Sequence, residues 1–279
     1  MNILTLEAPK TKTDRMNIRL SMKKVMPLLL LLSVFTFAAT NVAAKQEYYQ
    51  LKVYHYANKN QETTIDKFLK EAYLPAMHRY GIKKVGVFKL LANDTASKKM
   101  IFVLIPFRSL QQSIDIQKKL LKDKAYLEAG SEYIKALSSN SPFTNVENYL
   151  LEAFSEMPAM RVPKFTSSKE DRVYELRRYE ASTEALSANK IDMFNRGGEV
   201  KIFERLGFNA VFYGQVLFGG TLPSLMYMTS FENMKSRNEH WDSFRTDSDW
   251  KKLSAMEEYK GNVIRADTYL CKAAEYSDI

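Results

Sequence analysis

The sequence has little of what most catalytic and metal sites are built from. Its 279 residues include one cysteine and three histidines. The single cysteine, Cys271, excludes an intramolecular disulfide, and in a strand-like segment it is typical of a small buried hydrophobe. No two histidines have metal-ligand spacing, and no cluster of cysteines or carboxylates completes a ligand set. We therefore predict no metal site.

Motifs of nucleotide and hydrolase chemistry are missing as well. No G-x-S-x-G elbow marks an activated serine. Gly219-Gly220 lies in an expected hairpin with no helix after it, so it lacks the structural context of a dinucleotide-binding loop. The catalytic residues, if there are any, stay unknown, and we favour a function other than catalysis.

The apolar run near the N-terminus is too short to span a bilayer, which takes about 18–20 residues. Lys23 and Lys24 precede this run, and Val42-Ala43-Ala44 follows it with small residues. A charged start, an apolar core and a small-residue exit are typical of a secretory signal peptide rather than of a membrane anchor. We predict that a signal peptide, residues 1–44, is cleaved after Ala44 and leaves no integral membrane anchor. The protein is then exported to the periplasm or the exterior of a bacterial cell. Met1, Met16 and Met22 all stay open as translation starts.

Much of the positive charge belongs to this leader. Its removal takes away six basic and two acidic residues and lowers the formal net charge from +9 to +5. The remaining lysine pairs are scattered along the chain instead of forming one basic face. Nucleic-acid binding needs such a face, so we predict no nucleic-acid partner.

The rest of the chain is an internal duplication. Residues 49–54 (YQLKVY) return as residues 174–179 (YELRRY), a shift of 125. Further matches follow in the same order and with nearly constant offset: Arg79 to Gly81 with Arg205 to Gly207, Ile101 to Phe107 with Leu225 to Phe231, Asp123 and Tyr126 with Asp247 and Trp250, and Tyr149-Leu150 with Tyr269-Leu270. We predict one domain over 45–157, a linker rich in Pro and Ser over 158–170, and a second domain over 171–279.

Each copy is predicted to run strand, helix, strand, strand, helix, strand. Residues 49–54 alternate with period two, as in a half-buried strand. Pro75 predicts a kink or a restart within the first helix, and Gly81 its end. Ser109 with Gln112 and, further on, Asp123 are expected helix N-caps. This order is the ferredoxin-like arrangement βαββαβ. Its bare sheet face must be covered, so we expect two antiparallel sheets packed face to face or joined into a barrel, within one chain or in a homodimer.

The repeated segments resemble the NIPSNAP family. Residues 49–54 and 174–179 resemble its opening strand, and Met226-Tyr227-Met228 its third strand. Residues 247–250 (DSDW) resemble its D-P-x-W element, with Ser248 and Asp249 departing from that pattern. The second copy fits better than the first. The resemblance implies an α+β fold of the dimeric α/β-barrel type, as in exported bacterial proteins with two tandem domains, and offers no catalytic residues to carry over.

Five residues are candidates for ligand binding: Arg79, Arg205, Glu199, Tyr213 and His240. Arg79 and Arg205 are kept in both copies beside a helix-ending glycine. Each could grip a carboxylate or phosphate, or neutralise helix C-terminal carbonyls, which also favour a cation. His55 and His78 are expected on the surface.

His240 precedes Trp241 on the second helix of the second copy. In relatives of this barrel, such as chlorite dismutase-like proteins, a helix histidine holds haem, whereas the plainer interpretation is a partly exposed helix residue. We predict no cofactor, with haem at His240 as the alternative.

Three functions stay open. The preferred one is an exported protein that binds a small, partly apolar ligand between sheet and helices, or interacts with another molecule. The second is a cofactor-independent or haem-dependent oxygenase-like enzyme on the same barrel. The third is a structural subunit of a larger assembly.

Overall fold

The fold is known from a computed structural model that describes residues 45–93, 95 and 97–279. The predicted signal peptide and its cleavage after Ala44 lie outside the described residues. Among the residues that are described, none of the helices is both long and apolar enough to span a bilayer.

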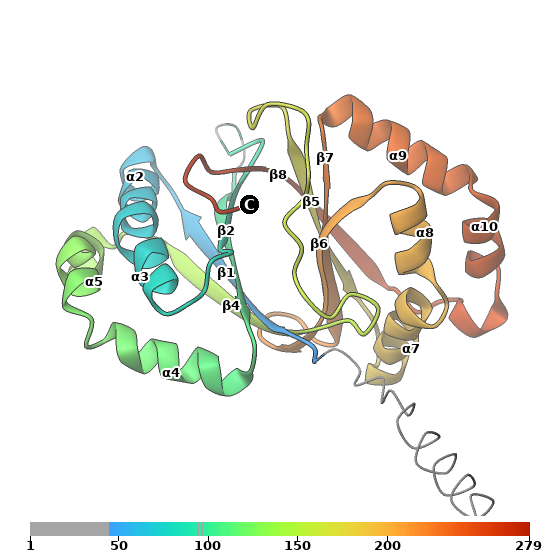
Figure 1. Cartoon of the computed structure of the whole chain (residues 1–279), viewed down its shortest axis with the longest axis horizontal. Coiled ribbons are helices and arrows are strands. Elements are labelled where there is room, and N and C mark those ends of the chain that lie inside the picture. The colour runs from blue at the N-terminus through green and yellow to red at the C-terminus, as the bar shows by residue number, and fades with distance from the viewer. Residues whose placement is uncertain (1–44, 94, 96) are drawn as a thin grey trace, which may run out of the picture. The chain divides into compact units, whose positions relative to one another are not determined.

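Strands from both copies form one closed antiparallel barrel (Figure 1). Around the barrel their order is β1-β3-β2-β8-β5-β7-β6-β4. The two copies meet where β2 pairs with β8 and where β4 pairs with β6. The α+β fold with two ferredoxin-like units is therefore confirmed, and the two sheets are joined within a single chain. The strands are β1 (Tyr48–Tyr56), β2 (Gly86–Leu90), β3 (Lys99–Phe107), β4 (Asn145–Ala153), β5 (Val173–Glu180), β6 (Asn209–Phe218), β7 (Ser224–Phe231) and β8 (Arg265–Ala273).

The helices pack outside the barrel in two groups, one from each copy, on opposite sides of it (Figure 1). The order predicted for each copy is confirmed. In the first copy the helices are α2 (Lys59–Phe68), η1 (Leu69–Tyr73), α3 (Leu74–Arg79), α4 (Leu110–Leu120), α5 (Lys124–Ala129), α6 (Ser131–Ile134) and η2 (Ser138–Asn140). In the second they are α7 (Glu184–Asn195), α8 (Glu199–Arg205), α9 (Met234–Thr246), α10 (Ser248–Ser254) and η3 (Glu257–Tyr259).

The predicted helix boundaries have the expected chemistry. Pro75 lies in the first turn of α3, directly after the π-helical turn η1, so the missing N–H of proline falls where the helix restarts. Gly81 has φ +84°, which a residue with a side chain rarely adopts. Ser109 accepts a hydrogen bond from Gln112 N at 3.2 Å, and Asp123 accepts one from Tyr126 N at 3.0 Å. Both predicted N-caps are confirmed.

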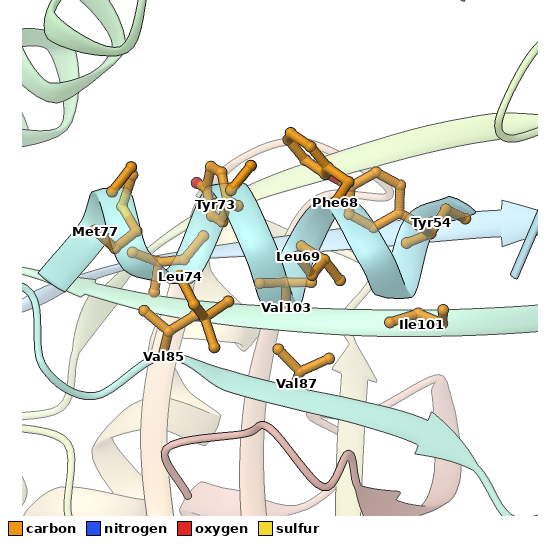
Figure 2. Packing of buried hydrophobic residues seen from close by; sticks show 14 of the residues in the cluster. Tyr54, Phe68, Leu69, Tyr73, Leu74, Met77, Val85, Val87, Ile101 and Val103 are labelled. Atoms are coloured by element: carbon orange, nitrogen blue, oxygen red, sulfur yellow. The ribbon is translucent and has the colours of Figure 1, made fainter. Parts of the chain in front are cut away.

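Strand alternation divides the apolar residues into three cores. Inward-facing side chains such as Leu51 and Leu176 fill the barrel. Outward-facing ones meet the helices, and in the first copy Leu69 and Leu74 lie over Val87 and Val103 of the sheet (Figure 2). A matching layer in the second copy is largely aromatic. Each copy thus covers the outer face of its own sheet, and the two copies share the inner one.

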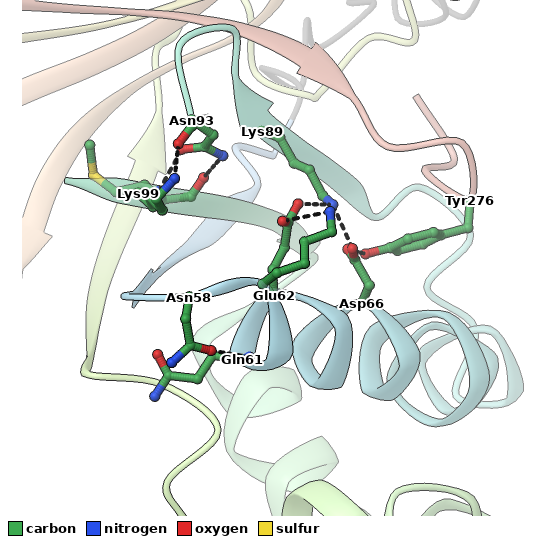
Figure 3. Close-up of polar contacts among 10 residues, drawn as sticks. Asn58, Gln61, Glu62, Asp66, Lys89, Asn93, Lys99 and Tyr276 are labelled. Atoms are coloured by element: carbon green, nitrogen blue, oxygen red, sulfur yellow. Dashed lines mark hydrogen bonds and ion pairs between the residues drawn. The ribbon is translucent and has the colours of Figure 1, made fainter. Parts of the chain in front are cut away.

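The C-terminal segment docks against the first copy. Lys89 Nζ contacts Glu62 Oε1 at 2.7 Å and Asp66 Oδ2 at 2.5 Å, and the Tyr276 hydroxyl donates to Asp66 Oδ1 at 2.6 Å (Figure 3). Ile279 is 6% exposed and joins the apolar residues inside the barrel. These contacts connect β2, α2 and the last residues of the second copy.

Candidate functional site

A cavity of about 240 Å³ opens at one end of the barrel. We call it the barrel-mouth cavity. Its walls are inward-facing residues of six strands and of the loop before β3, so both copies contribute. They are Leu51, Val53, His55, Lys98, Met100, Phe102, Glu147, Tyr149, Leu176, Arg178, Met226, Arg265 and Tyr269.

The cavity is apolar in its depth and polar at its rim. Leu51, Phe102 and Leu176 belong to the core inside the barrel and are almost fully buried. The polar residues lie toward the strand ends at the mouth, since β1 and β5 end there and β4 and β8 begin there. An apolar wall with a few converging polar groups is the usual form of a small-molecule site.

A chain of hydrogen bonds crosses this rim from one copy to the other. His55 Nε2 lies 2.8 Å from Glu147 Oε1, and the Tyr149 hydroxyl donates to Glu147 Oε2 at 2.5 Å. Arg178 Nη1 in turn donates to the Tyr149 hydroxyl at 3.3 Å. Burial alone would raise the pKa of Glu147, but the bonds from Tyr149 and His55 outweigh it and hold that pKa below its ordinary value. Glu147 is therefore an anion at neutral pH.

Arg178 is the central cation of the cavity. Its side chain is 12% exposed, and its Nη2 atom contacts Asp267 Oδ2 at 2.6 Å and Glu180 Oε1 at 2.8 Å. Burial opposes ionisation of Asp267, but Arg178 and Arg265 lower the pKa of Asp267 overall. The Nε atom of Arg178 is buried and has no hydrogen-bond partner. Buried donors are nearly always paired, so this N–H is available to an acceptor.

The duplication explains most of this lining. Glu147 and Tyr149 correspond to Asp267 and Tyr269 at a shift of 120. Arg178 breaks the pattern, because its counterpart in the first copy is Val53. The cavity thus has an approximately twofold lining with one buried cation on the side of the second copy.

Arg79 and Arg205, predicted from the sequence as candidate anion-binding groups, each form an ion pair with an N-cap carboxylate. Arg79 Nη2 donates to Asp123 Oδ2 at 2.7 Å, and Arg205 Nη2 donates to Asp247 Oδ1 at 2.9 Å. The guanidinium groups remain 43% and 48% exposed. The duplicated arginine therefore bridges the end of one helix to the start of another in both copies.

Glu199 and Tyr213 come together in the layer between the second sheet and its helices. Glu199 is 2% exposed, and its Oε2 atom accepts a hydrogen bond from Lys190 Nζ at 2.7 Å. Burial raises the pKa of Glu199 even with Lys190 beside it. Tyr213 is 1% exposed and stacks near Phe203 and Phe154. Aromatic side chains fill this layer around the ion pair.

His240 lies apart from those two, in an open groove of about 530 Å³ between α9, β6 and the linker. Its Nδ1 atom is 2.7 Å from the carbonyl oxygen of Ser236, which can only accept, so Nδ1 donates this hydrogen bond. Gly207 leaves room beside Nε2, since a Cβ atom at that position would come within 3.2 Å of it. Within the described part of the chain, no group of three His, Cys, Asp or Glu side chains could hold a metal ion.

The barrel-mouth cavity is not predicted by the sequence pattern. His55 and His78 were expected on the surface, yet their side chains are 20% and 35% exposed and are paired with Glu147 and Asp278. The one available signal was Arg178, a charge at an inward position of an alternating strand. Its partners come from strands of both copies, which the local pattern does not bring together.

Comparison with known proteins gives a family for part of the chain and a fold for nearly all of it. Residues 174–278 match the NIPSNAP family, and these residues are the better-fitting second copy. A search of the curated proteins found no match. Among solved structures, a protein provisionally named a monooxygenase from Fusobacterium nucleatum subsp. nucleatum is similar at 9% identity and a TM-score of 0.55, covering 82% of this chain and 93% of the other.

Two further structures have the same architecture. One, also provisionally named a monooxygenase, is from Lactobacillus acidophilus (12% identity, TM-score 0.51, 82% and 94% covered). The other is an anthrone oxidase-like protein (10% identity, TM-score 0.51, 83% and 93% covered). At these identities the likeness shows the fold alone.

Proposed function

Because the match of residues 174–278 to the NIPSNAP family brings no reaction to this chain, we propose a function from the cavity itself. The protein is an exported small-molecule-binding protein whose ligand enters the barrel-mouth cavity. Export rests on the leader before residue 45, with its charged start, apolar core and small-residue exit.

The observation that carries the proposal is a buried donor without a partner on Arg178, a residue that lines an otherwise largely apolar cavity. Arg178 Nε has no partner, while Leu51, Phe102 and Leu176 offer apolar contact beside it. A ligand with an acceptor atom at one end and a hydrocarbon body would satisfy both. At about 240 Å³ the cavity is slightly smaller than the usual range of about 300–1,000 Å³, which favours a compact ligand.

The charges at the rim favour an anionic acceptor. Glu147, Glu180 and Asp267 are all engaged by partners. Lys98 is exposed at the mouth, and Arg265 Nε pairs with Asp267 while its side chain stays 61% exposed. A carboxylate entering the cavity would meet two exposed cations at the rim before it reached Arg178. We therefore propose a small, partly apolar carboxylate as the class of ligand.

Native mass spectrometry of the protein isolated from its own host tests this proposal. We expect a retained small molecule on the wild-type protein. Met100→Trp would fill the cavity with an indole and remove the bound mass. Met234→Trp makes the same change at an exposed position on α9 and serves as the matched control.

A ligand panel tests the chemical class. Short aliphatic and aromatic carboxylates should raise the melting temperature of the wild-type protein more than the corresponding alcohols do. Met100→Trp should abolish that difference, and Met234→Trp should keep it. Equal shifts for acids and alcohols, or the same shifts in both variants, would show that the barrel mouth is not an anion-binding site.

A further inference from the structure

Comparison of the two copies points to a second site, on the outer face of the first sheet. We call it the α4 groove. It has a volume of about 280 Å³ and lies between α4 and the outer faces of β1 and β4, with the end of β6 beside it. Its lining contains no charged side chain: Gln50, Ser113, Ile114, Gln117, Asn148, Tyr149, Leu150 and Phe218.

In the second copy a side chain occupies the equivalent space. The N-caps Ser109 and Asn233 fix the correspondence between α4 and α9 at a shift of 124. Gln117 therefore corresponds to Trp241, and Gln50 on β1 corresponds to Glu175 on β5. The indole of Trp241 is 6% exposed, and its Nε1–H donates to Glu175 Oε2 at 2.8 Å.

In the first copy an acceptor remains at the position of Glu175, but no indole donates to it. Gln50 Nε2 donates to Asn148 Oδ1 at 3.0 Å, which orients the amide. The other amide atom, Gln50 Oε1, is buried and has no hydrogen-bond partner. An unpaired buried acceptor costs about 1–3 kcal/mol, so a donor entering this groove would relieve it.

Apolar surface around the groove is left exposed. Ile114 on α4 is 48% exposed and Phe218 at the end of β6 is 67% exposed. The α9 position equivalent to Ile114 is the polar residue Asn238. The first copy thus has an apolar groove with one unpaired acceptor. At the equivalent place the second copy has an aromatic ring that donates one hydrogen bond.

We propose that the α4 groove binds a small, uncharged, planar aromatic molecule that carries a ring N–H donor. The ring occupies the position of the Trp241 indole, packs against Ile114, Leu150 and Phe218, and donates to Gln50 Oε1. The ligand is uncharged because Glu175 and Arg237 are replaced here by Gln50 and Ser113. The site and the barrel-mouth cavity lie on opposite faces of β1, because Gln50 faces outward and Leu51 faces inward, and Tyr149 lines both.

Indole and 1-methylindole are the probes, because 1-methylindole keeps the ring and carries a methyl group in place of the N–H donor. We expect the wild-type protein to bind indole roughly fivefold more tightly in calorimetry, as one hydrogen bond implies. Gln50→Leu should bring the two affinities together. The preference for indole over 1-methylindole is measured on the wild-type protein, so it stands even if a variant fails to fold.

Gln117→Trp installs the residue of the second copy. It should abolish binding of both probes, and Gln111→Trp, on the exposed face of the same helix, should not. Met100→Trp should also leave indole binding unchanged, which separates this proposal from that for the barrel mouth. Equal affinity for the two probes, no binding at millimolar concentration, or indole binding that survives Gln117→Trp would overturn it. So would a concentration-dependent dimer that Gln117→Trp dissociates, because the groove would then be a surface for self-association.

Discussion

The two copies fix their helices to the sheet by different chemistry. In the second copy Glu175 is 0% exposed and accepts hydrogen bonds from Arg237, Arg177 and Trp241, all between 2.7 and 3.1 Å. In the first copy the corresponding residues, Gln50, Lys52, Ser113 and Gln117, form no such centre. As a result Trp241 on α9 is buried against the sheet, whereas α4 leaves a groove beside it.

This difference shows which parts of the repeated unit the fold requires. Both copies keep the strand alternation, the helix caps and the Arg–Asp bridge. The second carries charge in its helix–sheet layer at Glu175 and at the Lys190–Glu199 pair, whereas the first carries it elsewhere, at Lys52 and at the Lys89–Glu62 pair. The first copy fills the Lys190 and Glu199 positions with Ile65 and Tyr73. Buried ion pairs are therefore one solution to closing this layer, and neutral side chains are another.

Replacing the central anion should have the largest effect. Glu175→Gln, which installs the residue of the first copy, leaves Arg177 and Arg237 largely buried without a counter-charge. Breaking a buried pair from one side costs about 3–5 kcal/mol, and we expect about 4–5 kcal/mol because two cations lose their partner. Urea unfolding measures it, with Glu239→Gln on the exposed face of α9 as the control. A loss below about 1 kcal/mol would mean that the carboxylate does not hold α9.

Breaking the Lys190–Glu199 pair from one side should also destabilise the protein, but by less. Lys190→Met leaves Glu199 buried alone and should lower the unfolding free energy by about 3 kcal/mol at neutral pH. The loss should shrink toward pH 5, since burial raises the pKa of Glu199 and protonation removes the uncompensated charge. Adding Glu199→Gln should restore stability to within about 1 kcal/mol of wild type. If the double variant is no more stable than Lys190→Met alone, neutral side chains cannot replace this ion pair.

Much of the fold follows from local patterns. Alternation in residues 49–54 and 174–179, the expected caps at Ser109 and Asp123 and the helix stop at Gly81 all have local physical causes, and all are observed. The candidate sites do not follow in this way. Tyr149 and Arg178 meet only because the two sheets join into one barrel. Neither that contact nor the groove beside Gln50 can be predicted from one segment of the sequence. The repeat shows only that Gln117 corresponds to Trp241.

At Lys52, in the first copy, removal of a charge should instead stabilise the protein. Lys52 lies over the Tyr73 ring, 4.9 Å from its centroid, and burial lowers the pKa of Lys52 from 10.5 to about 8. Its counterpart Arg177 has Glu175 as a partner. Each pKa unit corresponds to about 1.4 kcal/mol, so Lys52→Met should raise the unfolding free energy by about 1–3 kcal/mol at pH 7.

The pH dependence of that gain has a definite sign. Between pH 8 and 10.5 the unfolded chain binds the Lys52 proton and the folded chain does not, so the stability of the wild type rises through this window relative to Lys52→Met. The advantage of the variant should therefore be largest below pH 8 and disappear near pH 10.5. Parallel unfolding curves of the two proteins measure it. A difference that is constant with pH would show that the amine is not desolvated.

The repeated arginines should matter little, and equally in both copies. Asp123 and Asp247 have pKa values below the ordinary 3.8, chiefly because Arg79 and Arg205 donate to them. The contribution of these pairs is present above pH 3.8 and is lost as the pH falls through the folded pKa values. Arg79→Ala and Arg205→Ala should each lower the melting temperature slightly at pH 7 and not at all in strong acid. A larger effect on ligand affinity than on stability would instead support the anion-binding interpretation.

The smallest effect is expected at His240, whose counterpart Ile116 is a buried core residue. An axial histidine needs open space in front of its lone pair, whereas the His240 ring makes edge contacts with Phe208 and Phe231. Adding haem to the purified protein should produce no shift of the Soret band, and His240→Ala should give the same spectrum as the wild type. A Soret shift that His240→Ala abolishes would show that this groove opens to hold haem, and would make the second copy the haem-binding half.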